Sequence, residues 1–160
     1  MDRLIQLLKE NGRSSVEELS SELGIGADQI EKIISDLIDS GAILGFTAIT
    51  DPSKIDDSDT VSALIEVKLT PERGGGFDRL ARRIAKFDEV ESCMLMSGGY
   101  DLCVVISGSS LHNVATFVAE KLSTLEGVIS TATHFQLKKY KSNGFLAELD
   151  GSGERLPVSP

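Results

Sequence analysis

One short run, Gly98, Gly99, Tyr100 and Asp101, combines backbone freedom with a carboxylate and a phenol. Glycine lets a ligand approach the backbone closely. Asp101 could hold an ammonium group, and Tyr100 offers an apolar ring with a polar tip. The same residues are also typical of a hairpin turn, in which glycine supplies a positive φ and Asp caps the turn. The sequence leaves both interpretations open, an effector pocket and a structural turn.

Other reactive residue types are sparse. Cys93 and Cys103 flank the run and could lie on adjacent strands, but they fit buried small apolar residues better than a redox pair. His112 and His134 have no second ligand at metal-binding spacing. Gly74–Gly76 lacks the Lys and Ser/Thr of a phosphate-binding loop. We therefore expect no catalytic residue, no metal and no cofactor.

A second candidate set lies in residues 27–40, where apolar residues recur at i, i+3, i+4, i+7 and i+8 and predict a helix. Its polar positions include Gln29, Lys32 and Ser35, which are residue types that contact DNA bases and phosphates. The same stretch holds four acidic residues and one basic residue. Each acid that faces a phosphate repels it, so the helix departs from the usual pattern of a DNA-reading helix.

Two more amphipathic segments precede this helix. Residues 4–8 place leucines on one face, and Ser15–Glu18 has the pattern of a capping box before a second helix. Three short helices cannot be stable alone, so they must share a core. The second and third, joined at residues 24–26, fit a helix-turn-helix. With a strand at residues 43–50 they form the predicted three-helix winged domain of residues 1–50.

A polar stretch at residues 51–60 is the predicted linker. Beyond it, apolar and polar residues alternate from Val61 to Leu69, which predicts a strand with one apolar face. We predict a helix next, then two strands joined at the Gly98–Gly99 turn, a second helix and a last strand. The predicted strands cover residues 90–97, 101–107 and 128–138, and the helices have Phe77, Leu80, Ala81 and Ile84, and Leu111, Val114, Ala115, Val118 and Leu122, on their inner faces.

A weak internal repeat at an offset of 38 residues supports this order, with Leu80 matching Val118 and Ile84 matching Leu122. Two strand-helix-strand units predict a ferredoxin-like βαββαβ domain at residues 61–141, with both helices on one face of a mixed sheet. The fold class is therefore α+β. The other sheet face has apolar residues such as Leu64, so we expect a partner subunit to cover it. Residues 142–160 are a tail that packs on the surface or on a neighbour.

The chain has 160 residues and a formal net charge of −9, which argues against indiscriminate nucleic-acid binding. The charge is uneven: residues 1–60 hold 5 Lys/Arg against 13 Asp/Glu, and residues 61–160 hold 11 against 12. We find neither a run of about 20 apolar residues nor a signal peptide. Two cysteines are too few for a secreted disulfide framework. We expect a cytoplasmic protein without membrane contacts.

The order of these elements resembles the Lrp/AsnC family of transcription regulators. Residues 8–13 resemble the end of the family's first helix, and residues 40–48 its helix-to-strand junction. Residues 96–102 resemble the signature turn of its sensor domain, and residues 131–140 its final strand. The ending at residues 154–160 is similar to tails in one subgroup. The likeness covers nearly the whole chain, and its order and spacing are specific.

The resemblance implies a homodimer built through the sensor domains, often assembled further into an octamer. It implies an amino acid or related small effector between sensor domains, held at the turn of residues 98–101 and on the last strand. The matching hydroxyls there are Thr131 and Thr133. It also implies DNA binding by the third helix, where the polar residues are Gln29, Lys32 and Ser35.

Three classes of function compete. An effector-responsive DNA-binding regulator agrees with the resemblance. A ligand-binding or assembly protein, whose helix-turn-helix binds protein or has lost strong DNA binding, agrees with the acidic third helix. Haem-pathway decarboxylases use a related two-domain plan, but no clustered His, Arg or nucleophile–base pair supports catalysis here. We therefore predict that the chain is not an enzyme.

Overall fold

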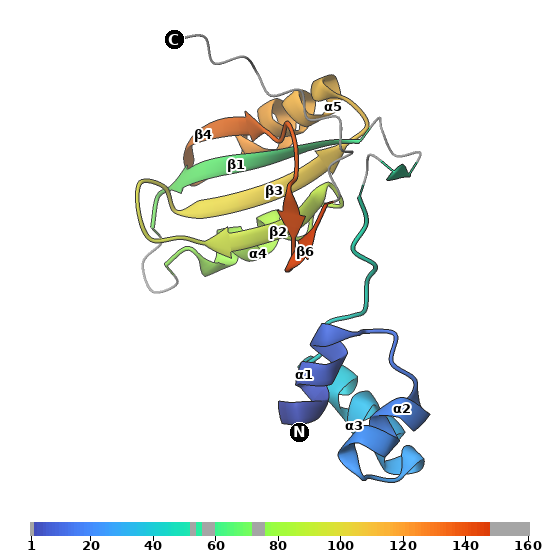
Figure 1. Ribbon diagram of the computed structural model, residues 1–160. Coiled ribbons are helices and arrows are strands. Elements are labelled where there is room, and N and C mark those ends of the chain that lie inside the picture. Colours follow the sequence, from blue (N-terminus) through green and yellow to red (C-terminus); the bar gives the residue numbers. More distant parts are fainter. Residues whose placement is uncertain (1, 52–53, 56–59, 72–75, 148–160) are drawn as a thin grey trace. The chain divides into compact units, whose positions relative to one another are not determined.

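The computed structural model describes residues 2–51, 54–55, 60–71 and 76–147. The chain forms two compact units, Met1–Ile49 and Thr50–Pro160 (Figure 1). Parts of the predicted linker, the first two residues of Gly74–Gly76 and the tail beyond residue 147 lie outside the described residues. Among the residues that are described, no helix is both long and apolar enough to cross a membrane.

The first unit contains the three predicted helices, α1 (Asp2–Glu10), α2 (Val16–Leu23) and α3 (Ala27–Asp39). The predicted capping box is confirmed. The Glu18 amide donates to Ser15 Oγ at 3.2 Å, and the Ser15 amide donates to Glu18 Oε2 at 2.8 Å. These two bonds satisfy amides at the start of α2, where the helix itself supplies no acceptors.

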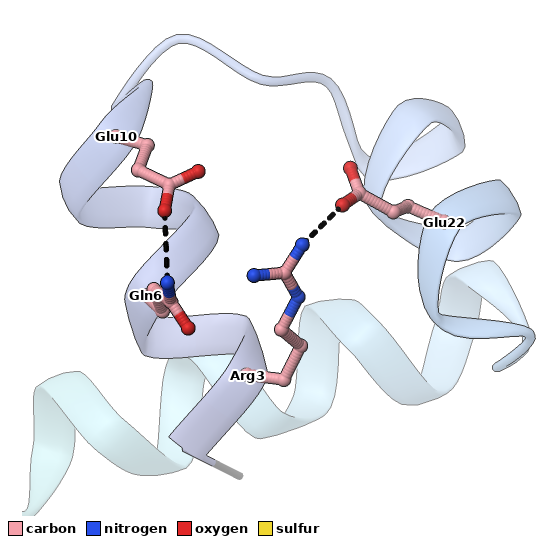
Figure 2. Close-up of polar contacts among 4 residues, drawn as sticks. All are labelled: Arg3, Gln6, Glu10 and Glu22. Atoms are coloured by element: carbon pink, nitrogen blue, oxygen red, sulfur yellow. Dashed lines mark hydrogen bonds and ion pairs between the residues drawn. The ribbon is translucent and has the colours of Figure 1, made fainter.

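One small apolar core joins the three helices. Leu4 and Leu7 from α1, Leu19 from α2 and Ile30 from α3 are buried together. A polar contact lies at the surface, where Arg3 of α1 donates to Glu22 of α2 at 2.9 Å (Figure 2). Both side chains in that ion pair are about half exposed, so water screens it and it contributes little to stability. The shared core is what holds the unit together.

The predicted strand at residues 43–50 is wrong, because these residues form no strand. A strand needs a hydrogen-bonded neighbour, and no described strand pairs with this segment. The unit is thus a three-helix domain without the β-wing that we expected. Leu44 is 97% exposed and Phe46 is 52% exposed. Phe46 lies beside Gly12, whose added Cβ would be 3.7 Å from the Phe46 ring.

The second unit has the ferredoxin-like order. Its sheet runs β2-β3-β1-β4, and Figure 1 shows the helices on one face. A two-stranded hairpin follows β4, within what we predicted to be the last strand and tail. The elements are β1 (Val61–Leu69), α4 (Asp78–Ile84), β2 (Val90–Leu95), β3 (Leu102–Gly108), α5 (Leu111–Thr116), the π-helix η2 (Phe117–Leu122), β4 (Val128–Phe135), β5 (Lys141–Ser142) and β6 (Phe145–Leu146).

The sheet is antiparallel throughout, so our expectation of a mixed sheet is wrong. Every neighbouring pair among β1 to β4 runs in opposite directions. Each strand-helix-strand crossover leaves two strands parallel, but a strand of the other half lies between them. The two halves therefore interlock, and no parallel pair is adjacent.

The core of this unit lies between the sheet and the helices. Ala63, Ile65, Val67 and Leu69 alternate along β1 and are at most 3% exposed, as their period-two pattern predicted. Ile84 and Leu122, which match in the internal repeat, are both fully buried. The repeat thus marks equivalent core positions in the two halves.

The inner face of the second helix differs from the prediction. Leu111 is 57% exposed and Ala115 is also exposed, whereas Phe117 is only 3% exposed. The helix changes to π geometry at Phe117, and the Ser123 amide donates five residues back to Val118 O at 2.8 Å. The π-turn accounts for the five-residue spacing between the buried Phe117 and Leu122, whereas Leu111 and Ala115 precede it.

We expect core and surface substitutions in the first unit to differ sharply. Leu19→Ala should lower the free energy of unfolding by roughly 2–5 kcal/mol, because it removes buried methyl groups and leaves a cavity. Arg3→Ala should change it by less than about 1 kcal/mol, because the ion pair with Glu22 is exposed. Urea denaturation followed by circular dichroism measures both. Equal losses would contradict a stability that rests on the shared core.

Candidate functional site

The turn between β2 and β3 is tied to the end of β1. The Asp101 amide donates to Val67 O at 3.0 Å, and the Met96 amide donates to Asp101 O at 2.8 Å. Gly98 has a φ of 147°, a conformation that side chains disfavour. The run is therefore a hairpin turn in which Gly98 supplies a positive φ, while the Asp101 side chain bonds to the Leu69 amide of β1.

Asp101 has a second connection to β1 through its side chain. Its Oδ2 accepts a hydrogen bond from the Leu69 amide at 2.7 Å. The carboxylate is half-buried, and only one of its two oxygens takes part in this bond. The bond fixes the position of the side chain, which is a condition for holding a ligand without a further loss of conformational freedom.

The predicted threonines lie on the other edge of β1. Thr131 pairs with Val67, and Thr133 pairs with Ile65. Since the Val67 carbonyl also accepts from Asp101, the structure brings Asp101 and Thr131 to the same end of β1 from opposite sides. Thr133 lies two residues farther along β4. Both threonines are half-buried and, by their pairing, on the helix-covered face of the sheet.

Sequence reasoning missed one polar group at this end of the domain. Ser123 Oγ lies 3.3 Å from Thr131 Oγ1. Ser123 follows the π-helix directly, so its direction depends on the change of helix geometry, and no pattern in the sequence indicates that change. Tyr100 is half-buried, while Gly98 and Gly99 are exposed. The backbone of the two glycines is therefore accessible to solvent, and the Tyr100 side chain is partly covered by the protein.

The α3 residues proposed to contact DNA are presented on the surface. Gln29, Lys32 and Ser35 are exposed, whereas Ile30 and Leu37 are buried. All four acidic side chains of α3 are exposed as well. Lys32 is the one basic residue of this helix, and the Arg3 charge on α1 is already paired with Glu22 (Figure 2). The surface of α3 is therefore chemically able to contact DNA, but its charge opposes phosphate.

The two cysteines lie on opposite faces of the sheet. Cys93 pairs with Val104 on the helix-covered face, and its thiol faces Ala81 O of α4 at 3.8 Å. Cys103 pairs with Met94 on the other face. Burial raises the pKa of both thiols, which disfavours the reactive thiolate. An internal disulfide does not fit this register, and the interpretation as small buried residues agrees with it.

The match to a family model is decisive. Residues 62–145 match the Lrp/AsnC ligand binding domain. The chain belongs to the Lrp/AsnC family. It is 46% identical over 157 residues to an uncharacterised HTH-type transcriptional regulator, YugG, of Bacillus subtilis, covering 98% of this chain and 95% of that protein. It is 30% identical to the proline dehydrogenase transcriptional activator of Rhizobium radiobacter, covering 89% and 90%.

Solved structures share the fold. The leucine response regulatory protein of Mycobacterium tuberculosis has a TM-score of 0.70 at 21% identity, covering 88% of this chain and 92% of its own. A transcriptional regulator of Neisseria meningitidis, solved in complex with L-Met, has a TM-score of 0.66 at 24% identity, covering 87% and 88%. Together, the relatives and the family model identify this Lrp/AsnC protein as a transcriptional regulator and not an enzyme.

The bond from the Leu69 amide to Asp101 gives a stability prediction. Asp101→Ala should lower the free energy of unfolding of the second unit by about 1–2 kcal/mol, because the amide loses its acceptor. Asp101→Asn should cost less, since an amide oxygen can still accept this bond. Urea denaturation of both variants measures the difference. If Asn and Ala were equally destabilising, the hydrogen bond would not be what holds the turn to β1.

Proposed function

We propose that this Lrp/AsnC regulator binds an amino acid or related small effector at the end of β1 and couples that binding to DNA contact through α3. The observation that supports the proposal is that Asp101 bonds to Val67 from one edge of β1 while Thr131 pairs with Val67 from the other edge. A carboxylate and a hydroxyl placed in this way match the two charged groups of an amino acid.

Each side chain has a role in this proposal. Asp101 accepts hydrogen bonds from the effector's ammonium group, through the oxygen that does not bind the Leu69 amide. Thr131 and Thr133 donate from their hydroxyls to its carboxylate. Gly98 and Gly99 permit close approach, and Tyr100 forms one wall. The Neisseria meningitidis neighbour solved with L-Met supports the chemical class, and the family model describes a ligand-binding domain.

We also propose a homodimer formed through the uncovered face of the sheet, with further assembly into octamers. Leu64 and Val105 pair across two strands on that face, and Met94 is 44% exposed there. Exposed apolar side chains in one patch favour a protein partner. Leu44 and Phe46 add exposed apolar surface on the first unit. A second copy supplies the self-complementary surface that a twofold contact needs.

The DNA contact is proposed for Gln29, Lys32 and Ser35 of α3. All three are exposed on the helix that follows the turn of the helix-turn-helix. The acidic residues between them make binding weak for one subunit, and several helices in one oligomer can raise the overall affinity. This function places the protein in the cytoplasm. The alternative, a protein-binding helix-turn-helix, is favoured by the exposed acids of α3.

The effector proposal predicts a loss of binding in Asp101→Asn. This variant keeps an acceptor for the Leu69 amide but removes the charge that pairs with the effector's ammonium group. Binding of the effector found in a panel of amino acids should weaken about tenfold or more, as measured by isothermal titration calorimetry. The matched control is Asp88→Asn, an exposed carboxylate outside the site. Unchanged binding in Asp101→Asn would contradict the assignment.

The DNA proposal predicts a change in salt dependence. Lys32→Gln should reduce the slope of log K against log salt by about 0.9 for each phosphate that Lys32 contacts. Lys9→Gln, an exposed lysine on α1, is the control and should leave the slope unchanged. Fluorescence anisotropy with the protein's own upstream DNA, over a range of salt, measures both. Equal slopes for the wild type and Lys32→Gln would favour the protein-binding alternative.

A further inference from the structure

A second cleft lies at the opposite end of β3 from the turn. It has a volume of about 280 Å³ and is lined by the last residues of β3 and by residues of α5 and η2. This is slightly smaller than the clefts that hold drug-sized ligands. Three apolar residues and three charged residues define its chemistry: Ile106, Val114 and Phe117, and Glu89, Glu120 and Lys121.

A fixed ion pair forms one side of the cleft. Lys121 Nζ binds Glu89 Oε1 and lies 5.9 Å from the centre of the Phe117 ring. The hydrogen bond from Lys121 lowers the pKa of Glu89, so this carboxyl stays ionised at neutral pH. Phe87 packs edge-on against Phe117 at 5.5 Å and supports the ring below the ammonium group. The cleft thus has an ammonium group beside a carboxylate.

Glu120 leaves the cleft with an excess negative charge. Its carboxylate is exposed, and no hydrogen bond or ion pair engages that side chain in the described part of the chain. Two carboxylates against one ammonium give the rim a net charge of −1. A ligand with its own ammonium group balances that charge, and Lys121 remains available on its other side for a carboxylate.

The helix that forms the wall has unusual geometry at this place. η2 covers Phe117–Leu122, which includes the three cleft residues Phe117, Glu120 and Lys121. π-helical turns are rare and are frequently found at functional sites. Gly108 lies at the mouth, where an added Cβ would be 3.2 Å from Val114 Cγ2, so β3 approaches α5 closely. The lining of the cleft therefore combines a π-helical segment with a close approach of β3 to α5.

We infer that this cleft is a second effector site, which binds a small apolar α-amino acid. The ammonium group of the ligand lies between Glu120 and Glu89, its carboxylate pairs with Lys121, and its side chain covers the small parts of Ile106, Val114 and Phe117 that line the cleft. The inference does not depend on the proposed site at Asp101, because the two sites lie at opposite ends of β3 and no residue is common to both.

The test isolates the cleft by using full-length protein with Asp101→Asn, which removes the charge of the turn site. Isothermal titration calorimetry is carried out with L-leucine, with 3-methylbutylamine, which lacks the carboxylate, and with 4-methylpentanoate, which lacks the ammonium group. Leucine and the amine should bind, and the acid should not. This order follows from the net negative charge of the rim.

Three further substitutions in that background locate the ligand. Glu120→Gln should weaken leucine about tenfold or more, because it removes a charge-assisted hydrogen bond; its exposed, unpaired side chain makes this variant safe for folding. Glu126→Gln, another exposed glutamate nearby in sequence and outside the cleft, should change nothing. Lys121→Gln should weaken leucine but not 3-methylbutylamine, since only leucine has a carboxylate for Lys121.

The possible outcomes separate the two sites. If neither leucine nor the amine binds the Asp101→Asn protein at millimolar concentrations, the cleft is not an effector site, whatever happens at the turn. Leucine binding that is indifferent to Glu120→Gln overturns the inference as well. If Asp101→Asn leaves wild-type binding intact and Glu120→Gln removes it, the proposal for the turn fails and the inference for the cleft stands.

Discussion

The sensor unit depends on one constraint, that β1 has hydrogen-bonded neighbours along both edges. β3 pairs with one edge of β1 and β4 pairs with the other. Beyond the last residue that pairs with β3, the Leu69 amide of β1 donates to the Asp101 carboxylate. Because side chains in paired strands share a face, these two registers decide which residues meet the helices. They also decide which residues reach the end of β1. Asp101 and Thr131 are 30 residues apart in sequence, and each is tied to Val67 of this strand from a different edge.

Much of the fold can be predicted from local pattern. The alternation along β1 predicted its buried face, the capping box predicted the start of α2, and the internal repeat predicted the order of the second unit. These features succeed because each depends on neighbours within one element or on a duplicated pattern. The segment at residues 43–50 failed because a strand is defined by its partner, and an apolar β-branched sequence does not supply one. The mixed sheet failed because direction depends on how the two halves interlock.

The candidate site was predictable in its residue types and not in its geometry. The sequence predicted Gly98, Tyr100 and Asp101 as ligand-binding or turn residues, and the structure shows that they lie in a turn between β2 and β3. The bond from the Leu69 amide to Asp101 joins residues 32 apart, and only the strand register brings them together. Ser123 and Phe117 were missed for a different reason. Phe117 begins the π-helix and Ser123 follows it, and the spacing of apolar residues does not reveal this change of helix geometry.

The internal repeat has a further consequence, which concerns charge and not packing. At the offset that aligns Ile84 with Leu122, Arg82 corresponds to Glu120 and Arg83 corresponds to Lys121. The two halves thus share the core position of Ile84 and Leu122 but differ in charge nearby, because Arg82 of the first helix corresponds to the acidic Glu120 of the second. The two repeated halves of the domain therefore carry different charges at one matching surface position. A small molecule with a positive end can therefore distinguish the two halves of the domain by their surface charge.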